Sequence, residues 1–321
     1  MSPLNETATE PASYIYTFSY PEEELSLCQL ESRAFFGFST ESTILESSLK
    51  LEPSRSPFIN ERISVIFKEE TLDALIDKVK RLPPLTSSFK VKVIKLKTTT
   101  RTEKISFEDR RAIERKLGLA IPGRADLQHP ERVFAVIKAQ EKWVFGHLKE
   151  SQSVWLTHQQ KPYQYSTALS TRVARAVVNI AAPHPAGLKV IDPCCGIGTV
   201  LVEALSMGID IEGSDNNPLV MKGARENIAH FGFEGQVRLR DIREVSGHFD
   251  AAILDLPYNL CSVITKQEQL EMLQSARRFA IRMVVVTVEP LDDVITQAGF
   301  SIVDRCEVLK GKFVRQVLVC E

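Results

Sequence analysis

Acidic residues and a glycine-rich turn stand where short apolar segments end in the second half of the chain. Residues 188–215 read LKVIDPCCGIGTVLVEALSMGIDIEGSD, in which Asp192 ends an apolar run and Gly196 and Gly198 follow two residues apart. Such a turn brings backbone N–H groups and a helix N-terminus close to an anionic ligand. Asp215 ends the next apolar run, where a carboxylate can accept hydrogen bonds from ribose hydroxyls. Many nucleotide-binding folds share these features, and a purely structural strand-to-helix turn also fits them.

A second motif, AAILDLPYNL at residues 251–260, also places polar chemistry at the end of an apolar run. Asp255 offers a carboxylate, Leu256 a main-chain carbonyl, and Tyr258 a ring that can stack on a base. Pro257 stiffens the backbone between them. Two polar motifs at strand ends favour one ligand site, because ligands bind at the carboxyl ends of the strands in a doubly wound sheet.

The elements that must position these motifs alternate regularly between strand and helix. We expect strands at 189–191, 209–214, 237–239, 250–254, 283–288, 300–308 and 313–319, and helices at 171–180, 199–206, 217–230, 267–279 and 291–298. The last two strands flank Lys310-Gly311-Lys312 and form an antiparallel hairpin. The fold class is therefore α/β, a doubly wound seven-stranded sheet.

The first half of the chain has a different order of elements. Strands at 14–20, 43–51, 63–67 and 89–97 and helices at 22–36 and 71–81 give β-α-β-β-α-β, the ferredoxin-like pattern. A helix from 106 to 117 and a hairpin of 133–138 with 143–145 follow. We expect a ferredoxin-like domain at 1–97, an α+β RNA-binding module at 98–150, a linker at 151–170 and the catalytic domain at 171–321.

Charge is concentrated in the middle of the chain. The chain as a whole carries a net charge of −1, whereas residues 61–150 hold 20 basic and 13 acidic side chains, a net charge of +7. A basic block is typical of a nucleic-acid-binding module, and an ordinary solvated surface fits it equally well. The candidate phosphate contacts are Lys90, Lys92, Arg110, Arg111, Arg115 and Lys116.

The two motifs together resemble a known family. DPCCGIGT followed by DLPY is similar to the class I S-adenosylmethionine-dependent methyltransferases that act on exocyclic amines of bases. With residues 101–146, which resemble a THUMP domain, the chain resembles the THUMP-domain tRNA guanosine-N2 methyltransferases of the guanosine-10 type. The resemblance implies the class I fold, S-adenosylmethionine as cofactor and tRNA as partner. Leu256 departs from it, because proline is usual at that position.

The resemblance also implies roles for residues of this chain. The methionine end of the cofactor is expected near Tyr165, Ser166 and Thr167 and along Asp192, Pro193, Cys194, Gly196, Gly198 and Thr199. Asp215 with Asn216 would hold the ribose, and Asp241 with Ile242 the adenine. Asp255, Leu256, Pro257 and Tyr258 are the catalytic candidates, with Asp255 also bordering the cofactor. An oxygen that accepts a hydrogen bond from the guanine amine favours its nucleophilic form.

Other functions stay open at this point. DLPY does not distinguish purines, so the target could be an adenine amine of rRNA or DNA; a protein-glutamine methyltransferase and a non-catalytic THUMP RNA-binding protein are further alternatives.

Six cysteines without a CxxC pair indicate free thiols, no metal site and a cytoplasmic location. The polar N-terminus and the absence of an 18-residue apolar run predict neither a signal peptide nor a membrane span. We expect a monomer or a homodimer.

Overall fold

The computed structural model describes residues 13–96, 105–139, 141–166, 168–256, 264–310 and 313–321. The chain folds into two compact units. The first unit comprises Met1–Ser19, Thr40–Ser54 and Phe58–Gln152, and the second comprises Tyr20–Ser39, Arg55–Pro57 and Ser153–Glu321. The chain therefore passes between the units five times, and each unit is described separately below.

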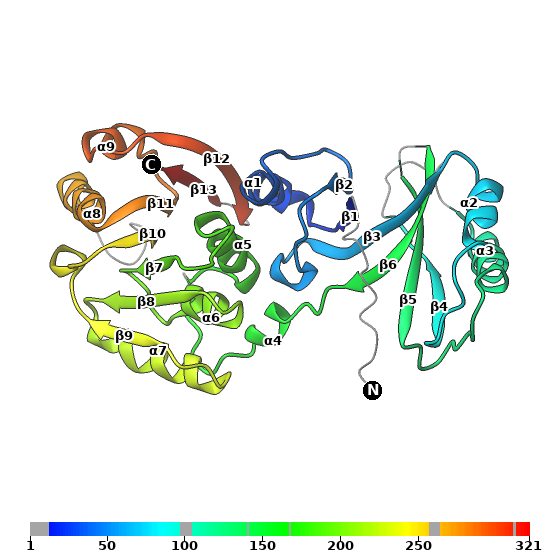
Figure 1. Cartoon of the computed structure of the whole chain (residues 1–321). Coiled ribbons are helices and arrows are strands. Elements are labelled where there is room, and N and C mark those ends of the chain that lie inside the picture. The colour runs from blue at the N-terminus through cyan, green and yellow to red at the C-terminus, as the bar shows by residue number, and fades with distance from the viewer. Residues whose placement is uncertain (1–12, 97–104, 140, 167, 257–263, 311–312) are drawn as a thin grey trace. The chain divides into compact units, whose positions relative to one another are not determined.

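The second unit contains a seven-stranded sheet in the order β12-β13-β11-β10-β7-β8-β9. Neighbours from β11 to β9 run parallel, and β13 runs antiparallel to both β11 and β12. This is the doubly wound sheet with a terminal antiparallel pair that the sequence predicted, so the class I methyltransferase fold is confirmed (Figure 1). The strands are β7 (Lys189–Asp192), β8 (Asp210–Asp215), β9 (Gln236–Leu239), β10 (Phe249–Asp255), β11 (Ala280–Thr287), β12 (Ile302–Lys310) and β13 (Phe313–Cys320).

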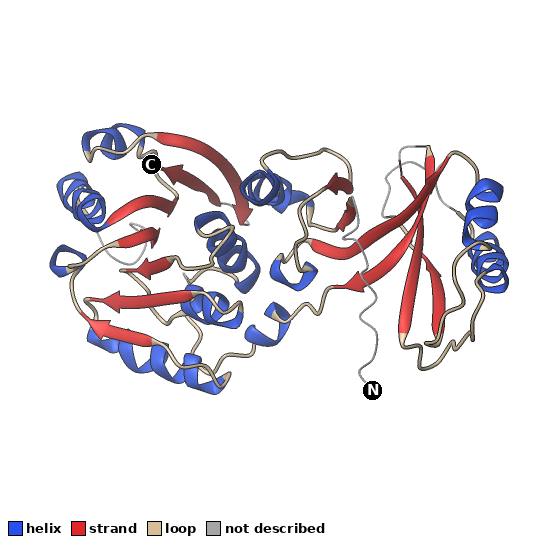
Figure 2. Ribbon diagram, in the orientation of Figure 1, coloured by secondary structure: helices blue, strands red, loops and turns tan. Residues whose placement is uncertain are grey.

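Helices cover both faces of this sheet (Figure 2). On one face α8 and α9 bury Leu273, Phe279 and Ile295 against strand residues such as Leu254 and Val285. On the other face α5 contacts β10 and β11, and α5, α6 and α7 form a connected row. The helices of this unit are α1 (Leu25–Phe36), α4 (Trp155–His158), α5 (Thr171–Ala181), α6 (Thr199–Ser206), α7 (Pro218–His230), α8 (Lys266–Phe279) and α9 (Asp292–Gln297).

The first unit is a six-stranded sheet in the order β2-β1-β3-β6-β5-β4. All neighbouring strands are antiparallel except β4 and β5. Helices α2 (Leu72–Val79) and α3 (Phe107–Ala120) pack on one face, where Leu75 and Leu117 meet Phe89, Phe134 and Phe145. The strands are β1 (Tyr14–Phe18), β2 (Ile44–Ser47), β3 (Ile59–Glu69), β4 (Phe89–Val93), β5 (Arg132–Ala139) and β6 (Lys142–Glu150).

The expected division of the first half near residue 97 is not a boundary between sheets. Strand β4 pairs in parallel with β5, and β3 pairs with β6, so strands from both expected modules share one sheet. Helix α1, expected in a ferredoxin-like domain, belongs to the second unit, where it contacts α5 and β12. Local patterns predicted the elements here, but the strand pairing that joins them lies between segments far apart in the chain.

The expected linker at 151–170 is anchored rather than free. Helix α4 buries Trp155 and His158, and His158 Nδ1 lies 2.8 Å from Oε1 of Glu203, a fully buried carboxylate on α6. Arg175 on α5 donates to the second carboxylate oxygen of Glu203 at 2.8 Å. A buried carboxylate needs partners of this kind, because an unpaired charge is costly in an apolar interior. The sequence alone indicates no role for His158, and the structure gives it this structural one.

Candidate active site

A cavity of about 500 Å³ opens at the carboxyl ends of β7, β8, β9 and β10 in the second unit. This volume falls in the range of small-molecule sites, and the position is where doubly wound sheets bind ligands. Of the residues predicted from the sequence, the structure places twelve in its lining: Tyr165, Asp192, Pro193, Cys194, Gly196, Thr199, Asp215, Asn216, Asp241, Ile242, Asp255 and Leu256.

The glycine-rich turn between β7 and α6 forms one wall. Gly196 and Gly198 adopt positive φ angles of 52° and 79°, which side chains other than glycine rarely allow. The N–H of Gly196 donates to Oδ2 of Asp215 at 2.8 Å, and the N–H of Cys195 donates to the carbonyl of Ser214 at 2.9 Å. The turn is therefore fixed to the end of β8, and Gly198, a predicted cofactor contact, does not line the cavity.

Two carboxylates at the ends of β8 and β9 face the cavity beside this turn. Oδ1 of Asp215 accepts the N–H of Asn217 at 2.9 Å, so both oxygens of Asp215 are engaged by backbone N–H groups. Asp241 accepts from Nε and from a terminal nitrogen of Arg243 at 2.9 Å each. These hydrogen bonds from Arg243 lower the pKa of Asp241 to about 2, so Asp241 is ionised at neutral pH.

Asp192 at the end of β7 differs from these two. Its side chain is 3% exposed, and burial raises its pKa well above the usual range for aspartate. The N–H of Cys194 donates to Asp192 at 3.2 Å and opposes the rise, whereas the nearby charges of Asp255 and Asp215 reinforce it. All three carboxylates line the cavity, and burial favours the protonated form of Asp192.

The cysteines of the turn are not activated. Burial raises the pKa of Cys194 and that of Cys195, and the negative charge of Asp192 acts in the same direction. A thiol with a raised pKa is a poor nucleophile, because the thiolate is the reactive form. Both residues therefore act as packing residues of the turn, with Cys194 partly open to the cavity.

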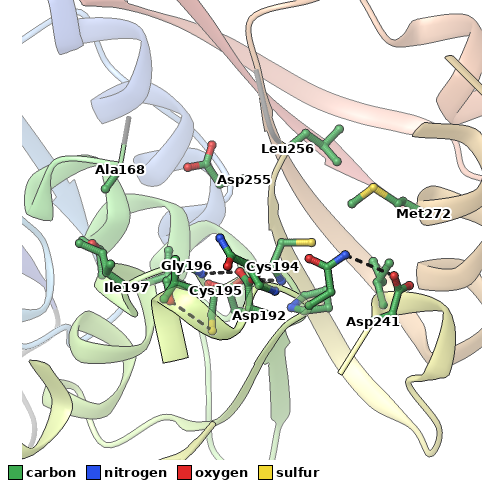
Figure 3. Close-up of a pocket in the computed structure, with 18 of the residues that line it drawn as sticks. Ala168, Asp192, Cys194, Cys195, Gly196, Ile197, Asp241, Asp255, Leu256 and Met272 are labelled. Atoms are coloured by element: carbon green, nitrogen blue, oxygen red, sulfur yellow. Dashed lines mark hydrogen bonds between the residues drawn. The ribbon is translucent and has the colours of Figure 1, made fainter. Parts of the chain in front are cut away.

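Strand β10 delivers the second motif to the same edge. Asp255 pairs in register with Val286, and Leu256 lines the cavity directly after it (Figure 3). The N–H of Leu256 donates to the carbonyl of Val286 at 3.1 Å, and its side chain is 2% exposed. Proline has no N–H and would lose this hydrogen bond, which explains structurally why leucine suits this position in this chain. Pro257 and Tyr258 lie outside the described residues.

The segment before α5 and the start of α8 complete the walls. Tyr165 lines the cavity as predicted and is 55% exposed; Ser166 does not line it, and Thr167 lies outside the described residues. Figure 3 shows Asp241 and Met272 toward one end of the hollow and Gly196 and Ile197 toward the other, with Asp255 between and above.

Several lining residues could not be picked out from the sequence patterns; they are Ile197, Ala168, Leu169, Asn217, Val220, Arg243, Glu268 and Met272 among others. A signal was available for two of them, Glu268 and Met272. They lie one helical turn apart at the start of the helix that follows β10, and such a helix begins at the carboxyl edge of the sheet. Arg243 had no such signal, because its place depends on its bond to Asp241.

The candidate phosphate contacts in the first unit fall on two faces of the sheet. Phe89, Val91 and Val93 of β4 are buried on the side of α2 and α3, so Lys90 and Lys92 point to the opposite face. The amine of Lys90 donates to the carbonyl of Leu127 at 3.2 Å, and Lys92 pairs with Glu150.

The other four candidates lie on α3. Arg115 and Lys116 are exposed, and the guanidinium groups of Arg110 and Arg111 lie 5.7 and 5.4 Å from the ring centroid of Phe107. Arg111 also pairs with Glu114 at 3.2 Å. The six residues therefore form two groups rather than one patch.

The described residues hold neither a metal site nor a membrane-spanning helix. Within the described ranges, no group of three or more His, Cys, Asp or Glu side chains is arranged to hold a metal ion. Of the helices in the part of the chain that the structure describes, none combines the length and apolar character required to cross a bilayer.

Comparisons with known proteins agree with this geometry. Residues 158–288 match the UPF0020 family, described as an RMKL-like methyltransferase domain. A tRNA (guanine(10)-N2)-dimethyltransferase of Methanothermobacter thermautotrophicus is 29% identical over 177 residues, which are 51% of this chain and 52% of that protein. A protein of the same name from Methanocaldococcus jannaschii is 24% identical over 68% of this chain and 72% of its own length. The mouse U6 snRNA (guanine-N(2))-methyltransferase THUMPD2 is 27% identical over 49% of this chain and 33% of its own length.

The crystal structure of TrmN from Thermus thermophilus overlaps 96% of this chain and 99% of its own at 18% identity, with a TM-score of 0.48. The chain spans about half the length of the first curated relatives it matches. Residues 158–288 of the second unit thus match the model of a methyltransferase domain, and the strand order of this unit is that of the class I methyltransferase fold.

Proposed function

We propose that this chain transfers a methyl group from S-adenosylmethionine to the exocyclic N2 amine of a guanosine in structured RNA, with guanosine 10 of tRNA as the first target to test. The proposal rests on one observation. Asp255 and Leu256, at the end of β10, line the same cavity as Asp215 and Asp241. The names of the relatives support RNA and guanine-N2 as the substrate class. The five described cysteines are free thiols, which supports a cytoplasmic location.

The residues of the cavity fit S-adenosylmethionine. Five lining residues, Asp192, Asp215, Asp241, Asp255 and Glu268, are acidic, and Arg243 is the basic one among the described lining residues. An acidic cavity suits a ligand that carries a sulfonium and an ammonium group. Thr199, the first residue of α6, is 5% exposed and lines the cavity, and its buried Oγ1 has no hydrogen-bond partner among the described residues. A buried hydroxyl without a partner is rare, and a polar ligand group would satisfy it.

The proposed roles are those that the family resemblance implies for residues of the glycine-rich turn and of the cavity lining. Asp215 holds the ribose hydroxyls and Asp241 the adenine amine. Asp192, the Gly196–Gly198 turn and Thr199 hold the methionine end. The cofactor supplies a methyl group on a positively charged sulfur, already activated for transfer.

The acceptor amine is oriented by the end of β10. The lone pair of a guanine amine is delocalised into the ring, so the nitrogen is a weak nucleophile. The Asp255 carboxylate and the Leu256 carbonyl accept hydrogen bonds from its two N–H groups, which holds the nitrogen toward the methyl group. Positioning of this kind supplies much of the rate in group transfer. The nitrogen gives up one proton, to Asp255 or to water, as the new N–C bond forms and the methyl–sulfur bond breaks, which leaves S-adenosylhomocysteine as the second product.

The six basic residues of the first unit, from Lys90 to Lys116, are proposed as contacts to RNA phosphates. The net charge of +7 in residues 61–150 supports binding of a polyanion. The target base must leave its stack to reach a cavity at a sheet edge.

Variants of Asp255 test the proposal. In single-turnover assays with saturating S-adenosylmethionine and tRNA, Asp255→Ala should lower the rate by about 10²–10³, as removal of one preorganised polar contact does in other enzymes. Asp255→Asn should be milder, because its amide oxygen still accepts. The matched control is Asp250→Asn at the opposite end of β10, where the carboxylate accepts the N–H of Lys189 at 2.8 Å. A rate for Asp255→Ala within a few-fold of the control, with both proteins folded, would remove Asp255 from the mechanism.

A further inference from the structure

The side chain of Asn227 on α7 joins two walls of the cavity without lining it. Asn227 is fully buried, and its amide makes three hydrogen bonds. Oδ1 accepts the N–H of Tyr163 at 2.9 Å, while Nδ2 donates to the carbonyls of Tyr163 at 3.1 Å and Ile197 at 2.9 Å. The orientation of the amide is fixed by this chemistry, because an N–H needs an acceptor and the two carbonyls need donors. Every hydrogen atom of the amide is thus used.

The two partners of Asn227 belong to different walls. Ile197 lies between Gly196 and Gly198 in the glycine-rich turn and lines the cavity. Tyr163 begins the segment 163–169, which contributes Tyr165, Ala168 and Leu169 to the lining. These two backbone stretches are more than 25 residues apart in the chain, and one side chain holds both.

Helix α7 approaches both walls closely. A Cβ atom at Gly198 would lie 3.4 Å from Ala224, and one at Gly223 would lie 3.3 Å from the side chain of Tyr163. Gly223, Ala224 and Asn227 lie within one turn of the helix, so they present one face to the two walls. The small residues permit the close approach, and the asparagine supplies the polar contacts.

We propose that Asn227 is a positioning residue that keeps the glycine-rich turn and the segment 163–169 at the spacing that the cofactor requires. This inference rests on the proposed function, because it takes the cavity as the S-adenosylmethionine site. The described residues of this segment, 163–166 and 168–169, lie in neither a helix nor a strand, so their position relies on side-chain contacts. Loss of the Asn227 amide removes the partner of the buried Ile197 carbonyl and of the partly buried carbonyl and N–H of Tyr163, and such groups draw in water or move apart. The walls then separate, and the ligand that bridges them binds less well.

Asn179 on α5 provides a matched control. It is also an asparagine with no exposed surface and three hydrogen bonds: Nδ2 donates to Glu31 at 2.6 Å and to the carbonyl of Arg55 at 2.9 Å, and Oδ1 accepts from Arg55 at 3.2 Å. None of its partners lines the cavity. Asn227→Ala and Asn179→Ala therefore remove the same groups from equally buried sites, and both should lower the melting temperature.

The first measurement is calorimetric titration of the full chain with S-adenosylmethionine and with S-adenosylhomocysteine. Asn227→Ala should weaken both dissociation constants about tenfold or more, which corresponds to about 1.4 kcal/mol. Asn179→Ala should change them less than twofold. Asn227→Asp, which keeps one acceptor and loses both donors, should resemble Asn227→Ala. Equal affinities in the two alanine variants, or equal losses, would overturn the inference.

The second measurement needs no ligand. In hydrogen exchange followed by mass spectrometry, Asn227→Ala should speed exchange in peptides covering 163–169 and 195–198, and Asn179→Ala should leave them unchanged. Unchanged exchange in these peptides of Asn227→Ala would overturn the inference.

If wild-type protein binds no S-adenosylmethionine, the proposed function fails, while the exchange comparison still decides whether Asn227 holds the two walls. If neither alanine variant folds, Asn227→Ser, which keeps one hydroxyl at the site, replaces Asn227→Ala in both measurements with the same expectations.

Discussion

Single residues carry the chemistry of this chain, and the environment of each sets what it does. Asp192, Asp215 and Asp255 each end a parallel strand and Asp241 lies two residues beyond another, so the topology of the sheet brings all four to one cavity. The sequence predicted this convergence, because apolar runs ending in aspartate are visible without a structure. It could not predict that burial favours the protonated form of Asp192 or that Arg243 engages Asp241, since both depend on neighbours from other strands.

The buried carboxyl of Asp192 should lower the stability of the folded chain and strengthen the binding of S-adenosylmethionine. Its pKa in the folded chain lies above the value of about 3.9 for an unfolded aspartate. The folded state therefore holds more protons, and the free energy of unfolding falls as pH rises through the folded pKa. Asp192→Asn removes this cost, so it should raise the melting temperature at neutral pH, by more at pH 8 than at pH 5.

The same variant should bind S-adenosylmethionine less well, because it lacks the negative charge that faces the ligand. Thermal melts from pH 5 to 8, with calorimetric titrations at each pH, check both parts. A melting temperature below that of wild type at every pH would contradict the assignment of Asp192 as a strained, buried acid.

At the scale of elements, hydrophobic periodicity predicted nearly every helix and strand. The position of each element in the fold depends on pairing between segments far apart in the chain. The sequence predicted the strands of the second unit but not their order in the sheet, because pairing between segments far apart in the chain sets that order. The sequence patterns give helix α1 the wrong neighbours, because its position rests on single polar residues. Glu31 on α1 is buried and accepts hydrogen bonds from Ser56 and Asn179, which tie the helix to α5.

Glu31 should make the stability of the second unit depend on pH. Burial raises its pKa to about 7, against hydrogen bonds from Ser56 and Asn179 that lower it. Its stabilising contribution is therefore complete below the unfolded pKa of about 4.3 and is lost as pH rises through about 7. Each unit of pKa shift corresponds to about 1.4 kcal/mol.

Glu31→Gln removes the titration while keeping a side chain of the same size. Denaturant melts at pH 5 and pH 8 should show a larger loss of stability with pH for wild type than for Glu31→Gln. Parallel pH profiles for the two proteins would show that Glu31 does not titrate in this range.

At the scale of the whole molecule, the two units carry different charge and different chemistry. The net positive charge lies in residues 61–150 of the first unit, while the second unit holds the acidic cavity. The charge distribution was readable from the sequence. The sequence did not show that the six candidate phosphate contacts fall on two faces of the sheet. That result depends both on the alternation of side chains along β4 and on the packing of α3.

Paired charge reversals test which face contacts RNA. Lys90 and Lys92 engage Leu127 and Glu150, and Arg111 pairs with Glu114, but α3 also exposes Arg115 and Lys116, so we expect the α3 group to contribute more. Arg110→Glu with Arg111→Glu should weaken tRNA binding and reduce the slope of log affinity against log salt by about 1 for each phosphate that the protein no longer neutralises. Lys90→Glu with Lys92→Glu serves as the comparison. Binding isotherms at several salt concentrations measure both, and equal slopes for the α3 variant and wild type would exclude the α3 face.

The identity of the methylated nucleoside tests the central claim most directly. The purified chain, a tRNA transcript with guanosine at position 10 and S-adenosylmethionine with a deuterated methyl group are incubated, and the RNA is digested to nucleosides for mass spectrometry. We expect labelled N2-methylguanosine or its N2,N2-dimethyl form, formed far more slowly by Asp255→Ala and absent when guanosine 10 is replaced by adenosine. Label found only in N6-methyladenosine, or no labelled nucleoside although cofactor and tRNA both bind, would contradict the proposed function.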